Sequence, residues 1–110
     1  MEYLLFICND PTAPPFDPTE DTTEEWVTEM DARGIRRAGN RLRPADDATT
    51  VAIRDGNVIV SDGPFAETKD WIGGFDIVEC SDLDEAIEVA AAHPMARFGT
   101  IEIRPVWPIE

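Results

Sequence analysis

Residues 3–8 read Tyr-Leu-Leu-Phe-Ile-Cys, an apolar run without the alternation of polar and apolar residues that a half-exposed strand shows. A strand of this kind belongs in the middle of a sheet that is covered on both faces. If helices cover one face, the other face needs a second layer, and the simplest source is the same sheet from another copy of the chain. The run therefore predicts a central strand in the sheet of a homodimer.

Two helices are predicted outside this strand. Asp17, Pro18 and Glu20 form the start signal of a first helix, whose buried face holds Trp26 and Met30 and which ends at Gly34. The second helix is predicted to begin with Ser81 as its N-cap and to end at Pro94. Its expected buried face consists of Leu83, Ile87 and Ala91.

Further strands are predicted at 35–43, 72–80 and 100–104, and a β-hairpin is predicted at 51–60 around the turn Asp55-Gly56. Without the hairpin the order is βαββαβ. Right-handed crossovers then give an antiparallel sheet with both helices on one face. The expected fold class is therefore α+β, ferredoxin-like with an inserted hairpin, in a single domain over residues 1–110.

Charge and cysteine content limit the expected partners and location. The chain has 23 acidic and 9 basic residues and a net charge of −14, which repels nucleic-acid phosphates and anionic lipid headgroups. The apolar run after Glu2 is too short for a signal peptide or a membrane span, so we expect a cytoplasmic location without nucleic-acid or membrane partners. Cys8 and Cys80 fall at opposite ends of the predicted sheet and cannot pair, which agrees with a reducing compartment.

The predicted topology brings Asn9, Asp10, the loop 62–71 and His93 to the end of the sheet where strand 3–8 finishes. Asp62 and His93 are the candidate catalytic residues, because a carboxylate could orient the only histidine for acid/base chemistry. Each has a structural alternative. His93 could instead complement the dipole of the second helix, which favours its charged form, and Asp62 could form the turn before Gly63.

Other residues of this end are candidates for ligand binding, and Asp10 is one of them. Lys69 could bind an acidic ligand if it and Glu67 point into a cavity, whereas outward-pointing side chains would be solvated. Gly73 and Gly74 could permit close approach of a ligand or mark a bulge. The arginines between 33 and 43 could hold a carboxylate or phosphate, or offset the acids of the first helix.

No cofactor or metal is expected. One histidine and two separated cysteines give no zinc-binding spacing, although Asp and Glu could still hold a hard cation. The glycine pair is not part of a dinucleotide-binding or phosphate-binding motif.

The octapeptide Asp-Gly-Pro-Phe-Ala-Glu-Thr-Lys at 62–69 resembles the motif of the DGPF group of the YCII-related family. Further matching stretches are Gly73-Gly74, 83–86, His93-Pro94 and 99–106, so the resemblance covers nearly the whole chain. It implies a dimeric α+β barrel. A few YCII relatives act on small aromatic compounds without an organic cofactor, using a His and Asp pair. Their histidine lies near the start of the first helix, where this chain has none, so the pair is not carried over by position.

Two functions remain open after the sequence is considered. The first is a homodimer that binds a small anionic or aromatic metabolite at the end of the sheet and carries out cofactor-free acid/base chemistry there. The second is a regulatory module, because members of the DGPF group are often associated with extracytoplasmic-function sigma factors. In that case the acidic face of the first helix would bind a basic protein.

Overall fold

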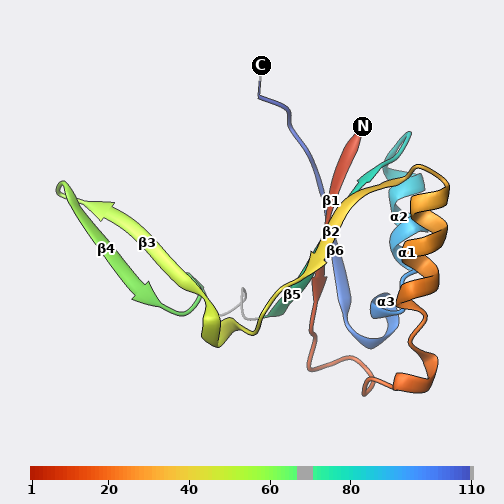
Figure 1. Ribbon diagram of the computed structural model, residues 1–110, viewed down its shortest axis with the longest axis horizontal. Helices are drawn as coiled ribbons and strands as arrows, with labels where there is room; N and C mark the ends of the chain where they lie inside the picture. The colour runs from red at the N-terminus through yellow and green to blue at the C-terminus, as the bar shows by residue number, and fades with distance from the viewer. Residues whose placement is uncertain (67–70, 110) are drawn as a thin grey trace.

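The computed structural model describes residues 1–66 and 71–109 and shows an α+β fold (Figure 1). Its main sheet has four antiparallel strands in the order β2-β5-β1-β6, and β1 lies between two neighbours as predicted. The bounds are Glu2–Cys8 for β1, Arg36–Arg41 for β2, Ile72–Glu79 for β5 and Thr100–Pro105 for β6. This strand order is that of the ferredoxin-like fold, so the predicted βαββαβ topology is confirmed.

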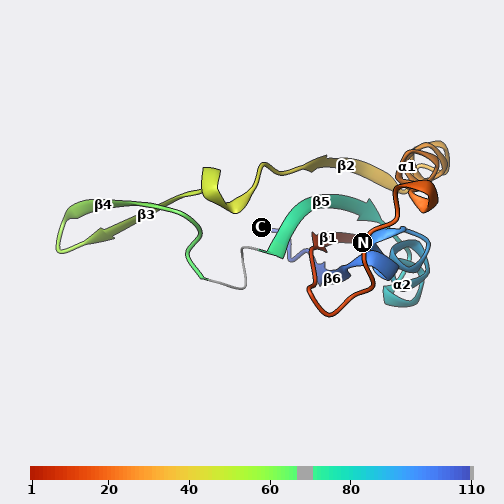
Figure 2. The same ribbon diagram turned by 90° about the horizontal axis from the view of Figure 1, so that it is seen from below.

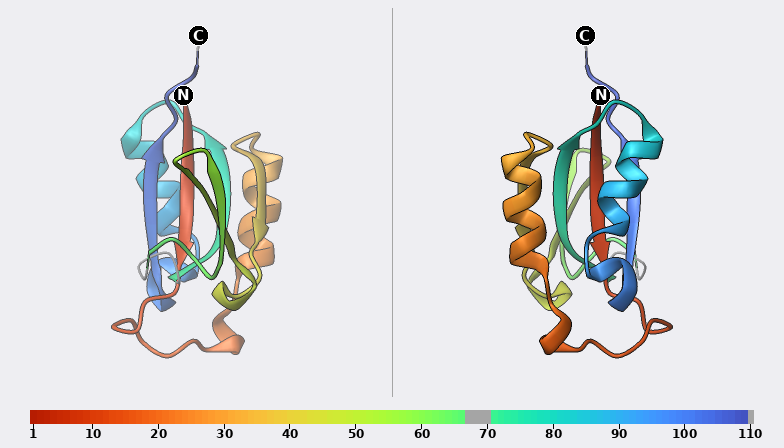
Figure 3. Two further views of the ribbon diagram at one scale, coloured as in Figure 1. Left: turned by 90° about the vertical axis from the view of Figure 1, so that its left-hand side faces the viewer. Right: turned by 90° about the vertical axis from the view of Figure 1, so that its right-hand side faces the viewer.

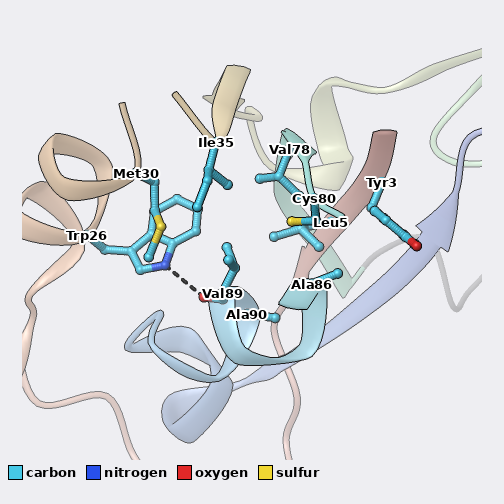
Figure 4. Packing of buried hydrophobic residues seen from close by; sticks show 10 residues of the cluster. All are labelled: Tyr3, Leu5, Trp26, Met30, Ile35, Val78, Cys80, Ala86, Val89 and Ala90. Carbon is cyan, nitrogen blue, oxygen red and sulfur yellow. Dashed lines mark hydrogen bonds between the residues drawn. The ribbon is translucent and has the colours of Figure 1, made fainter. Parts of the chain in front are cut away.

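The helices α1 (Thr23–Ala32) and α2 (Leu83–Ala91) both cover the same face of the main sheet, and the short α3 (Met95–Phe98) follows α2 (Figure 2). The core lies between these helices and β1 and β5, where Leu5, Met30, Val78 and Val89 are fully buried (Figure 4). The indole Nε1–H of Trp26 donates a hydrogen bond of 2.9 Å to the Val89 carbonyl oxygen and so joins α1 to α2. Burial of this apolar surface is the main stabilising term of the fold.

The first helix begins later than predicted. Asp17 caps only the 3₁₀ turn η1 (Pro18–Glu20), and Asp21 then adopts an extended backbone with ψ 102°. The Asp21 carboxylate accepts the N–H of Thr23, which makes a side-chain turn that competes with the helix. The rest of the prediction is confirmed, since Trp26 and Met30 are buried and Gly34 follows the helix with φ +70°.

The second helix starts one residue later than predicted. The Asp82 carboxylate, and not Ser81, accepts the N–H of Glu85 at 2.8 Å, and the Glu85 carboxylate in turn accepts the N–H of Ser81. The predicted buried face is wrong as well, because Leu83 and Ile87 are each 48% exposed. The residues that face the core are Ala86, Val89 and Ala90.

The hairpin consists of β3 (Thr49–Arg54) and β4 (Asn57–Asp62), joined by Asp55 and Gly56 with φ +52° and +78°. Positive φ at both turn residues is what a two-residue hairpin requires, so this prediction is confirmed. The hairpin does not join the main sheet, however, and forms a two-stranded sheet of its own. It projects from the main sheet on the side away from the helices (Figures 1 and 2).

The face of the main sheet opposite the helices carries apolar side chains that none of the described helices covers. Alternate residues of β1 and β5 point there, because Leu5 and Val78 on these strands point into the core. The side chains on this helix-free face include Leu4, Phe6, Phe75 and Ile77, which are half-buried. Seen from this side, the hairpin lies in front of the sheet (Figure 3).

Cys8 lies at one end of the main sheet, and Cys80, whose N–H bonds to Met1, lies at the other. Both thiols are free, as predicted from their positions. Among the helices in the described part of the chain, none is long and apolar enough to cross a membrane.

Candidate functional site

A cavity of about 490 Å³ lies at the end of the main sheet where β1 finishes and β5 begins. It extends between the sheet and the helix layer, because its lining includes Ile7 of β1, Val27 of α1 and His93 after α2. A volume of this size is typical of sites for small organic molecules. The topology therefore brings distant segments together at this end of the sheet, as predicted.

Gly73 and Gly74 line the cavity and form a bulge at the start of β5. Ile7 pairs with Gly74 but Cys8 pairs with Ile72, so Gly73 is the extra residue opposite β1. A Cβ on Gly74 would lie 3.0 Å from the Asn40 carbonyl oxygen, which leaves little room for a side chain. The structural alternative for the glycine pair is thus confirmed, and the bulge also shapes the cavity.

His93 is buried, with 5% of its surface exposed, and its ring packs edge-on against Trp26 at a centroid distance of 4.7 Å. Its Nδ1 accepts a hydrogen bond of 3.0 Å from the backbone N–H of Met95. Burial lowers the pKa of His93 to about 4, and the charge of Asp21 opposes this only in part. Burial therefore acts against the charged form of His93 that the helix dipole would favour.

The hydrogen bond to Met95 also determines which nitrogen of His93 carries a proton. A nitrogen that accepts a hydrogen bond has no hydrogen of its own, so the neutral ring carries its hydrogen on Nε2. His93 lines the cavity, and no described residue accepts a hydrogen bond from Nε2. Nε2–H is therefore the group that His93 can offer to a ligand.

The carboxylate beside His93 belongs to Asp21, a residue that the sequence did not single out. Asp21 lines the cavity, and its Oδ1 accepts hydrogen bonds from the N–H and the hydroxyl of Thr23, at 3.0 and 2.6 Å. The bonds from Thr23 lower the pKa of Asp21, and the charge of Arg41 acts in the same direction, as does that of His93 whenever its ring is protonated. The only signal in the sequence is an Asp-x-Thr pattern, which also occurs at Asp10 and Asp17 with the same side-chain turn.

Three arginines of the 33–43 cluster line the cavity, namely Arg36, Arg41 and Arg43. Two of them are held by carboxylates. Arg36 is bound to Asp76 and Asp31, and Arg43 to Asp47 at 2.9 Å. Arg41 makes no hydrogen bond or ion pair with any described residue, although its charge acts on Asp21. Arg41 is therefore the cation of the cavity that is most available to an anionic ligand.

The ion pair of Arg36 and Asp76 forms the inner wall of the cavity. The Arg36 Nε donates to Oδ1 of Asp76 at 2.8 Å, and Nη2 donates to the Gly39 carbonyl oxygen at 3.0 Å. Asp76 is 6% exposed, and its burial raises the pKa of the carboxyl although Arg36 opposes the shift. Gly39 is needed beside this pair, because a Cβ there would collide with the Asp76 carboxylate.

Two other predicted site residues, Asp62 and Asp10, do not line the cavity. Asp62 pairs with Thr49 at the base of the hairpin and does not line the cavity, so it is Asp21 and not Asp62 that the structure places near His93. Asp10 accepts a hydrogen bond of 2.6 Å from the Thr100 hydroxyl and tethers its loop to β6. Glu67 and Lys69 lie outside the described residues. Within residues 1–66 and 71–109, no three His, Cys, Asp or Glu side chains are grouped so that they could hold a metal ion.

Comparison with known proteins adds a family to this geometry. The family model described as the YCII-related domain matches residues 1–110. The chain belongs to the YCII-related family. An uncharacterised protein from Rhizobium meliloti is 37% identical over 125 residues, and the match covers 96% of this chain and 92% of that protein. The family predicted from the sequence is confirmed.

The solved structure of another protein is similar to this YCII-related chain. It is 5-chloro-2-hydroxyhydroquinone dehydrochlorinase from Burkholderia phenoliruptrix, in complex with 2,5-dihydroxybenzoquinone. The two proteins are 15% identical, the TM-score is 0.45, and the match covers 97% of this chain and 94% of that chain. The similarity is distant in both sequence and structure.

Proposed function

We propose that this YCII-related protein binds a small anionic metabolite in the cavity between the main sheet and the helices. The observation that carries the proposal is the presence of two hydrogen-bond donors on the wall of this cavity. Arg41 is a cation without an ion-pair partner among the described residues, and His93 is a neutral ring with Nε2–H available. A carboxylate or phenolate oxygen is the kind of group that both donors would bind.

The charge distribution supports an anion in this place. The whole chain carries a net charge of −14, yet three of its nine basic residues, Arg36, Arg41 and Arg43, line the cavity. Asp21 and Asp76 reduce the positive charge of the wall, but Asp76 is neutralised by Arg36. A ligand that carries one negative charge would therefore meet Arg41 as its counter-ion.

The rest of the wall supports an apolar body for the ligand. Phe16, Val27, Ile72 and Met95 line the cavity together with the polar groups. Apolar walls with a few well-placed polar groups are characteristic of small-molecule sites. The ligand class that fits both the polar and the apolar part of the wall is an organic acid or phenol with an aromatic or alkyl body.

The unliganded geometry supports binding more directly than proton abstraction. His93 Nδ1 is occupied by the Met95 N–H, and Nε2 carries the ring hydrogen, so neither nitrogen is free to accept a proton from a ligand. Any acid/base chemistry at His93 would begin with donation from Nε2 to a ligand oxygen. Asp21, whose carboxylate is ionised at neutral pH, would then be the base nearest to the imidazole.

A thermal-shift titration with benzoates, aliphatic acids and phenols tests this proposal. A binder raises the free energy of unfolding by RT ln(1 + [L]/Kd), and the melting temperature rises with it, so affinities can be compared between variants. Arg41→Gln should raise the dissociation constant for an acid about tenfold. Arg33→Gln is the matched control, because it makes the same charge change at the C-cap of α1 and Arg33 does not line the cavity. The proposal is wrong if Arg41→Gln and Arg33→Gln respond as the native protein does.

We also propose the homodimer and the dimeric α+β barrel that the sequence predicts. Support comes from the helix-free face, where Leu4, Phe6, Phe75 and Ile77 lack a covering layer. Two such faces packed together would supply it. Sedimentation equilibrium at micromolar concentration should show a dimer, and a monomer there would contradict this assembly.

A second candidate function is regulation through a protein partner in the cytoplasm. Glu24, Glu25 and Glu29 are exposed on α1, and a shallow hollow beside them is lined in part by Glu25 and Glu29. This acidic side would suit a basic surface such as that of an extracytoplasmic-function sigma factor. Co-purification with such a factor should yield a complex that dissociates at high salt and is lost when the three glutamates become glutamine. Co-purification without any complex would count against this candidate.

A further inference from the structure

One face of the β3–β4 hairpin carries a stripe of apolar side chains. The cross-strand pairs Val51–Val60 and Ile53–Val58 stand next to each other on this face. Their side chains are between 63% and 65% exposed. Four adjacent β-branched side chains left in water form a patch of the kind that marks an interaction surface.

The hairpin has little support within its own chain. Within residues 1–66 and 71–109 it shares no strand pairing with the main sheet. Its base is closed by hydrogen bonds from the Gly63 N–H to the Ala48 carbonyl oxygen at 2.8 Å and from the Thr50 hydroxyl to the Gly63 carbonyl oxygen at 2.7 Å. An isolated two-stranded hairpin is marginally stable in water at best. A partner that covers the stripe would therefore also stabilise the hairpin conformation.

The overall dimensions show how much surface a partner would cover. The accessible surface is 7938 Å², whereas a compact monomer of 12.2 kDa has about 6,100 Å². The radius of gyration is 15.9 Å, against about 13 Å for a compact chain of this length. The excess surface is roughly twice the ~800 Å² that one partner contributes to a standard interface. The surface is large enough for a stable dimer.

Charge and position identify the occupant as a second copy. Residues 49–62 include one basic and two acidic side chains, Arg54, Asp55 and Asp62, so the hairpin is nearly neutral in a chain of net charge −14. Two copies would repel each other least at this element, and the stripe offers nothing to a charged partner. The hairpin also lies on the same side as the helix-free face (Figures 1 and 3). The hairpin and the proposed dimer interface therefore lie on the same side of the molecule.

We infer that the β3–β4 hairpin is an arm that grips a second copy of this chain, with its stripe packed against the helix-free side of that copy. The inference rests on the proposed homodimer and adds the segment that secures it. A two-fold axis lets each copy extend one arm and receive one, so every stripe is covered without further growth of the assembly.

The test compares two neighbouring substitutions on β4. Val60→Glu places a charge in the stripe, and Ser61→Glu places the same charge on the opposite face of the hairpin. Sedimentation equilibrium should show that Val60→Glu raises the dimer dissociation constant at least about tenfold, while Ser61→Glu leaves it near the native value. Because the hairpin lies outside the buried core, far-UV circular dichroism should show both variants folded.

Hydrogen exchange supplies an independent measurement on the native protein. The amides of β3 and β4 should become more protected as the concentration rises through the dimer dissociation constant. If the native protein is a dimer and Val60→Glu dimerises equally well, the proposed role of the hairpin is wrong, while the proposed homodimer stands. If the native protein stays monomeric, both the homodimer and the arm are wrong, and the ligand site of the cavity is unaffected.

Discussion

Nδ1 of His93 accepts a hydrogen bond from the backbone N–H of Met95 across Pro94, at 3.0 Å. This bond joins the end of α2 to the first residue of α3 and holds the imidazole against Trp26. It also keeps the ring in the tautomer that presents Nε2–H. The same contact therefore shapes the local turn and sets what His93 can offer to the cavity.

The low pKa of His93 predicts a stability that depends on pH. An unfolded histidine has a pKa of about 6.5, so between that value and the folded pKa of about 4 the unfolded state binds more protons. Stability is therefore lost as the pH falls through this window. In His93→Asn the amide oxygen can accept the Met95 N–H without titrating. The loss of unfolding free energy between pH 7 and pH 5 should be smaller in the variant by about 2 kcal/mol.

Urea unfolding at both pH values measures this difference. Protonation of the carboxylates with lowered pKa values, including Asp10, Asp17 and Asp21, also lowers the stability of the protein in acid. These groups are present in both proteins, so their contributions cancel in the comparison. Equal losses in native protein and variant would show that His93 titrates in its ordinary range.

The two ion pairs beside the cavity should differ greatly in their contribution to stability. Asp76→Ala leaves the guanidinium of Arg36 half-buried without its nearest partner and should lower the unfolding free energy by about 3 kcal/mol. Asp47→Ala breaks the exposed pair with Arg43 and should cost less than about 0.5 kcal/mol. Chemical denaturation measures both variants, and similar losses would contradict the burial of the first pair.

The start of α2 gives a prediction about helix capping. Asp82→Ala removes the carboxylate that accepts the Glu85 N–H and should cost about 1 kcal/mol. Ser81→Ala leaves the observed cap in place, because Ser81 contributes only its backbone N–H, and should be nearly neutral. Thermal unfolding of the two variants decides between the caps. The opposite order of stability would restore Ser81 as the N-cap.

The hydrogen bond between the helices can be tested at Trp26. Trp26→Phe keeps an aromatic ring but removes the Nε1–H that bonds the Val89 carbonyl oxygen, and it leaves a gap in the core. The expected loss is about 2 kcal/mol. Trp71→Phe is the control at an exposed tryptophan and should change stability by less than about 0.5 kcal/mol. Comparable losses would contradict the distinct role of Trp26.

Patterns that recur along the chain predicted the fold well. The apolar run at 3–8 indicated a central strand, and right-handed connections then determined the strand order. Asp55-Gly56 determined the pairing of β3 with β4, because turn chemistry is local. Where the hairpin lies relative to the main sheet was not predictable in this way, since it depends on contacts that the turn does not encode. The buried face of α2 was misjudged because leucine and isoleucine give a stronger pattern than alanine.

The candidate site was predicted only in outline. Topology indicated the end of the sheet, and Gly73, Gly74 and His93 lie there. The neutral state of His93 could not be predicted, because it follows from burial in the tertiary structure. Asp21 was missed because its Asp-x-Thr pattern is a local turn signal that also occurs at Asp10 and Asp17, and nothing local tells which of the three reaches the cavity.

Strand β5 turns Asp76 toward the helices and the next residue, Ile77, toward the helix-free side. Neighbouring positions in one short segment thus belong to two surfaces with opposite chemistry. Mutations at positions 74, 76 and 78 act on the interior or the cavity wall, while a mutation of Ile77 acts on the face beyond. Related proteins can therefore diverge on one side of this strand while they keep the residues of the other, and an engineer can rebuild one side without redesigning the other.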